Sequence, residues 1–95
     1  MANIAFKRLG TAKLALAIWG KLRAQRYACP YTGDRLIPGV NASLDHIKPV
    51  SLYPELARSI DNVEWVTLDV NLAKRTLDSE QFIALCRRVT IHRSN

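Results

Sequence analysis

An aspartate and a histidine are adjacent in the segment "SLDHIKPVS", residues 43–51. Neighbouring side chains of a β-strand point to opposite faces, so Asp45 and His46 serve one site only where the strand ends and the backbone turns. Pro49 favours such an end, because proline is confined to the edges and ends of strands. A carboxylate is a hard ligand for Mg²⁺ or Mn²⁺, and an imidazole can accept a proton near neutral pH. Whether the pair serves one site depends on what the following residues supply.

Further polar residues follow along the chain. Asn71, Lys74 and Arg75 stand at i, i+3 and i+4, so they share one face of a predicted helix. If that face packs over the end of the strand, Asp45, His46, Asn71 and Lys74 converge. The amide oxygen of Asn71 would then be a second metal ligand, and Lys74 would neutralise a phosphate. This is the set of groups that phosphodiester hydrolysis requires.

The size of the barrier explains why the whole set matters. A general base accelerates a reaction roughly 10²–10⁴-fold, whereas enzymes lower barriers by about 8–23 kcal/mol. His46 alone is insufficient, so a cation must stabilise the developing charge. Taken singly, each residue is better explained as a cap, a turn residue or a solvated charge. Taken jointly, they favour a nuclease.

The surrounding pattern predicts a single α+β domain over residues 1–95. Leu14, Ile18 and Leu22 recur at helical spacing within residues 8–27. The predicted elements that follow are turns or a hairpin at 28–43, a strand at 42–47, a long loop at 48–61, a strand at 62–66 and a helix at 67–77. We divide the chain into a basic helical segment (1–28), a core (29–77) and a C-terminal helix with its tail (78–95).

Two helix starts have recognisable caps. Thr67 is the expected N-cap of the helix at 67–77, and Asp78 with Gln81 forms a capping-box pattern at the start of the last helix. The last helix is expected to pack through an apolar face made of Phe82, Leu85, Cys86 and Val89.

The net charge of +6 is concentrated near the N-terminus. Residues 1–33 contain six basic residues and no acidic ones, namely Lys7, Arg8, Lys13, Lys21, Arg23 and Arg26. A one-sided basic segment suits a polyanion such as DNA, although a solvated helix face is the simpler alternative. The residues expected to bind nucleic acid are Lys21, Arg23, Arg26, Lys48, Lys74 and Arg75.

We expect neither a membrane span nor a secretory signal, because the apolar runs are short and flanked by basic residues. Its two cysteines, Cys29 and Cys86, form no disulfide framework and fit a reducing compartment. We therefore expect a cytoplasmic protein without a membrane partner.

The segments "LDHIKP" and "NVEWVTLDVNLAK" resemble the HNH nuclease motif, whose fold is called ββα-metal. The resemblance covers residues 29–74. It implies that His46 is the general base, that Asp45 and Asn71 hold one Mg²⁺ or Mn²⁺ ion, and that Asn62 braces the loop and helps orient the histidine. It also implies DNA cleavage, usually of one strand per active site, with little sequence specificity.

The chain departs from that family at the positions where many relatives bind a structural zinc through two CxxC pairs. The corresponding residues here are Cys29, Thr32, Thr67 and Val70, so no structural zinc is expected. The loop at 48–61 replaces a Gly-rich loop, and local packing of Leu52, Tyr53 and Leu56 is expected to compensate for the missing metal.

Two other functions remain open at this stage. The chain is alternatively a nucleic-acid-binding module without turnover, or a nuclease subunit that acts only with a partner. The sequence does not decide between a monomer and a homodimer.

Overall fold

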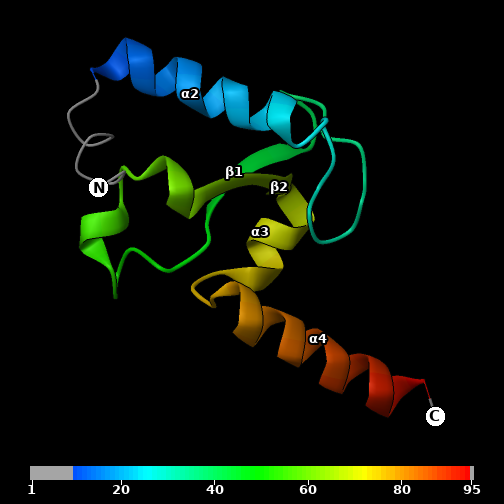
Figure 1. Ribbon diagram of the computed structural model, residues 1–95. Helices are drawn as coiled ribbons and strands as arrows, with labels where there is room; N and C mark the ends of the chain where they lie inside the picture. Colours follow the sequence, from blue (N-terminus) through cyan, green and yellow to red (C-terminus); the bar gives the residue numbers. More distant parts are fainter. Residues whose placement is uncertain (1–9, 95) are drawn as a thin grey trace.

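The computed structural model describes residues 10–94 (Figure 1). This part of the chain forms a small α+β domain, as predicted, with three α-helices and one two-stranded antiparallel sheet. In chain order the elements are α2 (Thr11–Ala24), β1 (Ala42–His46), the 3₁₀ turns η1 (Pro54–Leu56) and η2 (Ile60–Asn62), β2 (Val63–Thr67), α3 (Leu68–Lys74) and α4 (Ser79–Arg93).

The sheet places Asp45 and His46 at the end of β1, as the sequence predicts. Asp45 lies opposite Glu64, and His46, the last residue of β1, lies opposite Val63. The chain turns immediately afterwards, and Pro49 is buried in that turn. Helix α3 follows β2 directly and contacts both strands, whereas α2 packs on β2. In Figure 1, α2 and α3 lie on opposite sides of the strands.

The core is formed by residues of α2, the turns after it, β2, α3 and α4. Its buried members are Leu22, Cys29, Leu36, Trp65, Val66, Val70 and Phe82. Burying aliphatic and aromatic side chains of this kind contributes roughly 1.5–3 kcal/mol each. Because β2 and α3 supply three of these residues, the core fixes the position of α3 against the sheet.

Gln25 joins α2 to the sheet by hydrogen bonds to the backbone of Trp65. The Gln25 Nε2 donates to the Trp65 carbonyl over 2.8 Å, and the Trp65 N–H donates to Gln25 Oε1, also over 2.8 Å. The Trp65 indole donates to the Ile18 carbonyl, and its ring stacks on Trp19 at a centroid distance of 5.3 Å. The Gln25 amide thus pairs with the N–H and the carbonyl of Trp65, as the backbone of a neighbouring strand would.

Both predicted helix caps are confirmed. The Val70 N–H donates to the Thr67 hydroxyl over 3.2 Å, and Asp78 with Gln81 forms the complete capping box. The helices are shorter than predicted at their C-terminal ends. Arg26 and Arg75 adopt left-handed backbone conformations, with φ of 55° and 52°, and these end α2 and α3 before residues 27 and 77. The start predicted for the first helix, at residue 8, lies outside the described residues.

Two packing expectations are wrong. Of the predicted apolar face of α4 only Phe82 is buried, whereas Leu85, Cys86 and Val89 are exposed. Figure 1 shows why: α4 projects from the domain instead of lying along it. In the long loop, Leu52 is 73% exposed, so it does not pack as expected. Within residues 10–94 no helix has the length and apolar character needed to cross a membrane.

We predict that Gln25→Ala lowers the free energy of unfolding by about 2 kcal/mol. The change leaves the N–H and the carbonyl of Trp65 without their side-chain partner, and an unsatisfied buried polar group costs about 1–3 kcal/mol. Urea denaturation measures the loss. Arg23→Ala is the control for truncating a side chain near the end of α2, because Arg23 is exposed. If Gln25→Ala unfolds at the same urea concentration as wild type, the bridging role is wrong.

Candidate active site

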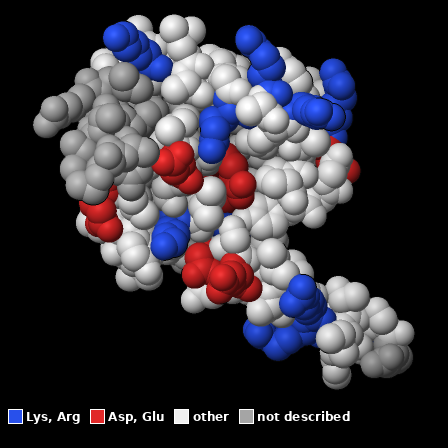
Figure 2. All heavy atoms as spheres, viewed as in Figure 1, with Lys and Arg blue, Asp and Glu red and all other residues white. Residues whose placement is uncertain are grey.

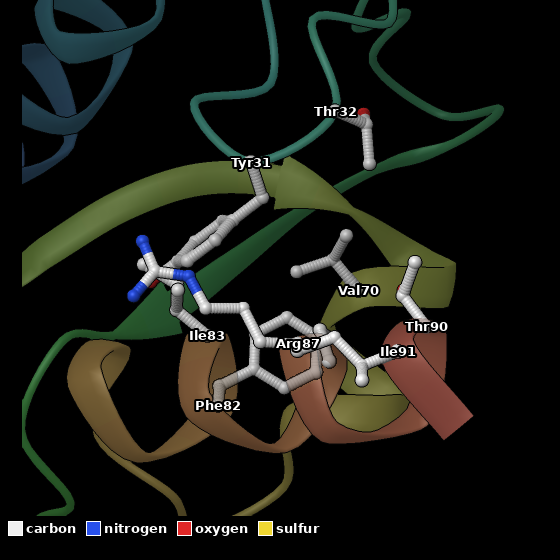
Figure 3. Close-up of a pocket in the computed structure, with 9 residues that line it drawn as sticks. Tyr31, Thr32, Val70, Phe82, Ile83, Arg87, Thr90 and Ile91 are labelled. Atoms are coloured by element: carbon white, nitrogen blue, oxygen red, sulfur yellow. The ribbon is translucent and has the colours of Figure 1, made fainter. Parts of the chain in front are cut away.

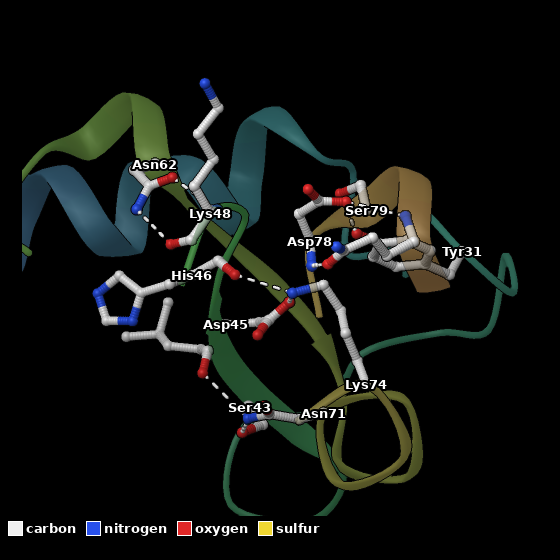
Figure 4. Close-up of polar contacts among 12 residues, drawn as sticks. Tyr31, Ser43, Asp45, His46, Lys48, Asn62, Asn71, Lys74, Asp78 and Ser79 are labelled. Carbon is white, nitrogen blue, oxygen red and sulfur yellow. Dashed lines mark hydrogen bonds and ion pairs between the residues drawn. The ribbon is translucent and has the colours of Figure 1, made fainter. Parts of the chain in front are cut away.

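A cleft of about 290 Å³ lies at the end of β1. It is bordered by β1, the turn after it and the last part of α3, through Leu44, Asp45, His46, Pro49, Val50, Ser51, Asn71, Arg75 and Thr76. The three residues of the predicted chemistry, Asp45, His46 and Asn71, therefore line the same cleft. In Figure 4 the Asp45 carboxylate lies toward Lys74, the Asn71 amide lies beside Ser43, and the His46 ring extends to the left.

Asn71 is fixed by β1 through its amide nitrogen. Its Nδ2 donates to the Ser43 hydroxyl over 2.6 Å and to the Leu44 carbonyl over 3.1 Å. Both N–H groups of the amide are thereby used. The remaining polar atom is Oδ1, which is the atom that a hard cation would bind.

The His46 imidazole is oriented by a backbone carbonyl from the long loop. Its Nε2 lies 3.2 Å from the carbonyl oxygen of Ala57, just after η1. This contact assigns the proton of the neutral imidazole to Nε2, which donates to the carbonyl. Nδ1 then carries the lone pair and can accept a proton.

Asn62 holds the turn that follows His46. Its Oδ1 accepts from the Lys48 N–H over 2.9 Å, and its Nδ2 donates to the Lys48 carbonyl over 3.1 Å. The Ile47 N–H donates to the Asn62 carbonyl over 2.8 Å. Asn62 is 5% exposed, so this clamp is buried. It contacts the backbone beyond His46, while Ala57 contacts the imidazole itself.

Lys74 occupies a different place from the one expected. We expected its ammonium to meet a phosphate, but Lys74 is 1% exposed. Its Nζ lies 3.0 Å from Asp45 Oδ2 and donates to the His46 carbonyl over 2.9 Å (Figure 4). An ammonium buried in this way cannot reach a substrate. Its position instead makes Lys74 the counter-ion of Asp45.

The carboxylate of Asp45 is buried, and its hydrogen bonding is incomplete. The Oδ2 atom contacts Lys74 at ion-pair distance, but it accepts no hydrogen bond from the described residues. Glu64 lies opposite Asp45 on β2. Burial raises the pKa of the Glu64 carboxyl, and the nearby Asp45 charge raises it further, although Tyr31 and Lys74 act in the other direction. The site thus concentrates negative charge around one ammonium.

Of the six cations expected to bind nucleic acid, Arg75 borders the cleft. Lys48 lies on the far side of the turn, with its Nζ 5.2 Å from the centre of the Tyr53 ring. The other described candidates, apart from the buried Lys74, belong to α2 and the turn after it: Lys21, Arg23 and Arg26. Figure 2 shows Lys and Arg side chains along the edge where α2 lies, and acidic side chains nearer the middle of this face.

The donor atoms fit a hard divalent cation in kind. Asp45 offers a carboxylate, whose Oδ2 lies 3.0 Å from the Lys74 ammonium, and Asn71 offers an amide oxygen. Two protein ligands suit Mg²⁺, which retains several waters in its coordination shell. Among residues 10–94 no group of three or more His, Cys, Asp or Glu side chains is arranged to hold a metal, so this site would depend on its amide ligand and on water.

The four positions that the sequence resemblance aligns with zinc cysteines, Cys29, Thr32, Thr67 and Val70, lie together. The Cys29 thiol receives hydrogen bonds from Thr32 and from the backbone of Thr67, and these lower its pKa despite the opposing effect of burial. Val70 packs in the same core cluster as Cys29, and its N–H donates to the Thr67 hydroxyl. One thiol, two hydroxyls and an isopropyl group offer no zinc site of the usual cysteine type.

Two contributors to the site were missed by the sequence reasoning. Ala57 acts through its backbone carbonyl, which the residue type does not encode, so no sequence signal could have indicated it. Glu64 could have been found, because the alternation of "NVEWV" and the strand register place it beside Asp45.

No protein-family model matches the chain, and comparison with curated proteins likewise finds no match.

We predict that Lys74→Met destabilises the protein by about 3–5 kcal/mol. Methionine keeps most of the side-chain volume but leaves the buried Asp45 carboxylate without its counter-ion, which is the costly way to break a buried pair. Arg75→Met is the matched control, because it removes an exposed cation from the adjacent residue and should change stability by less than about 0.5 kcal/mol. Chemical denaturation compares the two. Equal losses of stability in the two variants would show that the Lys74–Asp45 pair contributes no more than an exposed cation does.

Proposed function

We propose that this chain is a metal-dependent DNA endonuclease of the HNH type. The observation that carries the proposal is that Asp45, His46 and Asn71 all border one cleft. Asp45 and His46 are strand neighbours, whose side chains normally point to opposite faces, and Asn71 lies far from both in the sequence. An acid, a base and an amide oxygen in one place are the groups that cation-assisted phosphodiester hydrolysis uses.

The order of elements supports the ββα-metal part of the proposal. An antiparallel pair of strands joined by a long loop is followed directly by a helix that contacts both strands. The catalytic candidates stand on β1, in the loop and on α3, and the positions expected for zinc cysteines meet elsewhere, beside the core. Both features agree with the arrangement that the sequence resemblance implies.

In the proposed mechanism, His46 Nδ1 accepts a proton from the water that attacks the phosphorus atom. The Ala57 carbonyl keeps the imidazole in the required tautomer and orientation, and Asn62 keeps the backbone beyond it in place. Asp45 and Asn71 would hold the cation, which when bound stabilises negative charge on the phosphate and on the departing oxygen. Lys74 positions Asp45, and Arg75 faces the phosphate.

DNA is the proposed substrate because of the charge distribution. Arg75 at the cleft and the exposed cations at the end of α2 can contact phosphates without reading bases. Such binding releases counterions, so we expect it to weaken steeply with salt and to show little sequence preference.

One observation favours a second candidate, a DNA-binding module without turnover. Asp45 is 5% exposed, and its charge is already balanced by Lys74. A divalent cation would have to share this carboxylate with the ammonium. If the ammonium prevents cation binding, the chain binds DNA without cleaving it. Cleavage would then be absent altogether or would require a partner subunit.

We predict that the purified chain nicks supercoiled plasmid in Mg²⁺ or Mn²⁺, that a chelator abolishes nicking, and that His46→Ala lowers the rate at least about 100-fold, as expected for loss of a general base. His92→Ala is the matched control, because it removes the other histidine from the exposed end of α4. If wild type and His46→Ala both bind DNA but neither nicks it, with or without metal, the non-catalytic module is favoured.

Arg75 provides a separate test, because its backbone is strained. With φ 52° and ψ −115° at the C-cap of α3, it occupies a conformation that glycine adopts far more readily. Strain of this kind costs of order 1–3 kcal/mol and tends to persist at functional sites. An arginine in this conformation at the edge of the cleft supports a substrate-binding role.

We predict that Arg75→Gly raises the free energy of unfolding by about 1 kcal/mol while nicking falls at least about tenfold. Arg75→Ala should lose activity to the same extent without the gain in stability, since alanine retains the strain. Thermal unfolding and the plasmid assay, run on the same samples, separate the two effects. Full activity of Arg75→Gly would remove Arg75 from the proposed phosphate contact.

A further inference from the structure

Helix α4 presents apolar side chains that the rest of the described chain does not cover. Phe82 is its buried residue, with its ring edge against Tyr31 at a centroid distance of 5.6 Å. Beyond this anchor, Ile83 is 41% exposed and Val89 is 54% exposed. A groove of about 420 Å³ runs along the helix beside Tyr31 and Val70 (Figure 3).

A helix of this length with so little support is only marginally stable in water. Isolated helices shorter than about 12–15 residues are marginal in water, and most helix stability comes from packing an apolar face. α4 has 15 residues, and apart from the region around Phe82 it makes no extensive contact with the other described helices and strands. The capping box stabilises its first turn only. The part of α4 beyond this turn needs a second surface.

The residues on one side of α4 indicate what that surface is. Glu80, Ile83, Ala84 and Arg87 stand at i, i+3, i+4 and i+7, so they form one face, and all four are exposed. Along the helix the charges are separated: Asp78 and Glu80 are at its N-terminal end, and the arginines lie toward its C-terminal end.

This separation of charge disfavours a continuous polyanion as the partner, because DNA would meet Glu80 and apolar side chains on the same face. It matches a second α4 running in the opposite direction. In that arrangement the acidic end of each helix meets the basic end of the other, and the small Ala84 lets the helices approach closely. A parallel pair would instead place like charges side by side.

We propose that two copies of this chain associate through antiparallel pairing of their α4 helices. Glu80 of each copy faces Arg87 of the other, and the two Ile83 side chains meet near the crossing point. This pairing does not depend on the proposed nuclease activity. If both hold, the assembly carries two clefts and can cut both strands of a duplex.

The test is sedimentation equilibrium of the full chain over a concentration series. We expect a dimer that dissociates on dilution. Glu80→Arg and Arg87→Glu each replace two symmetric ion pairs by like-charge contacts, so each should weaken the dimer at least about tenfold. The double variant Glu80→Arg/Arg87→Glu restores opposite charges between copies and should recover the dimer. Arg88→Glu is the matched control, since it makes the same charge change outside this face.

Circular dichroism of each variant shows whether α4 still forms, so loss of the dimer is not confused with loss of the helix. A wild-type chain that is monomeric at every concentration overturns the proposal, as does a double variant that fails to recover. A monomer whose retention on DNA is weakened by Arg87→Glu also overturns it, and would instead make α4 a nucleic-acid contact.

Discussion

The candidate site depends on one buried ion pair, that of Lys74 with Asp45. The ammonium comes from the last residue of α3, and the carboxylate comes from the end of β1, so the contact joins the two elements that carry the site. The same ammonium donates to the His46 carbonyl and thereby fixes the backbone of the proposed base. Buried ion pairs contribute little net stability relative to apolar packing, but losing one partner is costly. The pair therefore specifies the geometry of the site more than it stabilises the fold.

The loop between the strands does the rest of the positioning through its backbone. Asn62 clamps Lys48 at both amide groups, and Ala57 offers its carbonyl to His46. An imidazole that is free to rotate is a poor base, so holding its orientation is part of the proposed chemistry. A long loop is useful here because it brings a carbonyl to a ring eleven residues earlier in the chain.

What the sequence predicts well is what local residue types encode. Thr67, Asp78 and Gln81 define helix starts whatever the tertiary fold, and Pro49 ends the strand. Burial was harder to predict. The position of Lys74 on the helix is compatible with solvent or with the interior, and only the depth at which α3 sits on β1 decides between them. The apolar residues of α4 likewise indicate a contact surface without indicating which surface it contacts.

The absence of zinc cysteines bears on how the chain stays folded. A structural zinc provides about 10–16 kcal/mol of apparent binding free energy in small domains. Here Cys29, Thr67 and Val70 meet through hydrogen bonds and apolar packing. A hydrogen bond contributes about 0.5–1.5 kcal/mol and a buried apolar side chain about 1.5–3 kcal/mol. A domain of 95 residues with a core this small needs other sources of stability. Gln25 bound to the backbone of Trp65 is one of them, and pairing of α4 would be another. In such a chain, assembly and stability would be linked, since burying α4 in a dimer stabilises the fold by mass action.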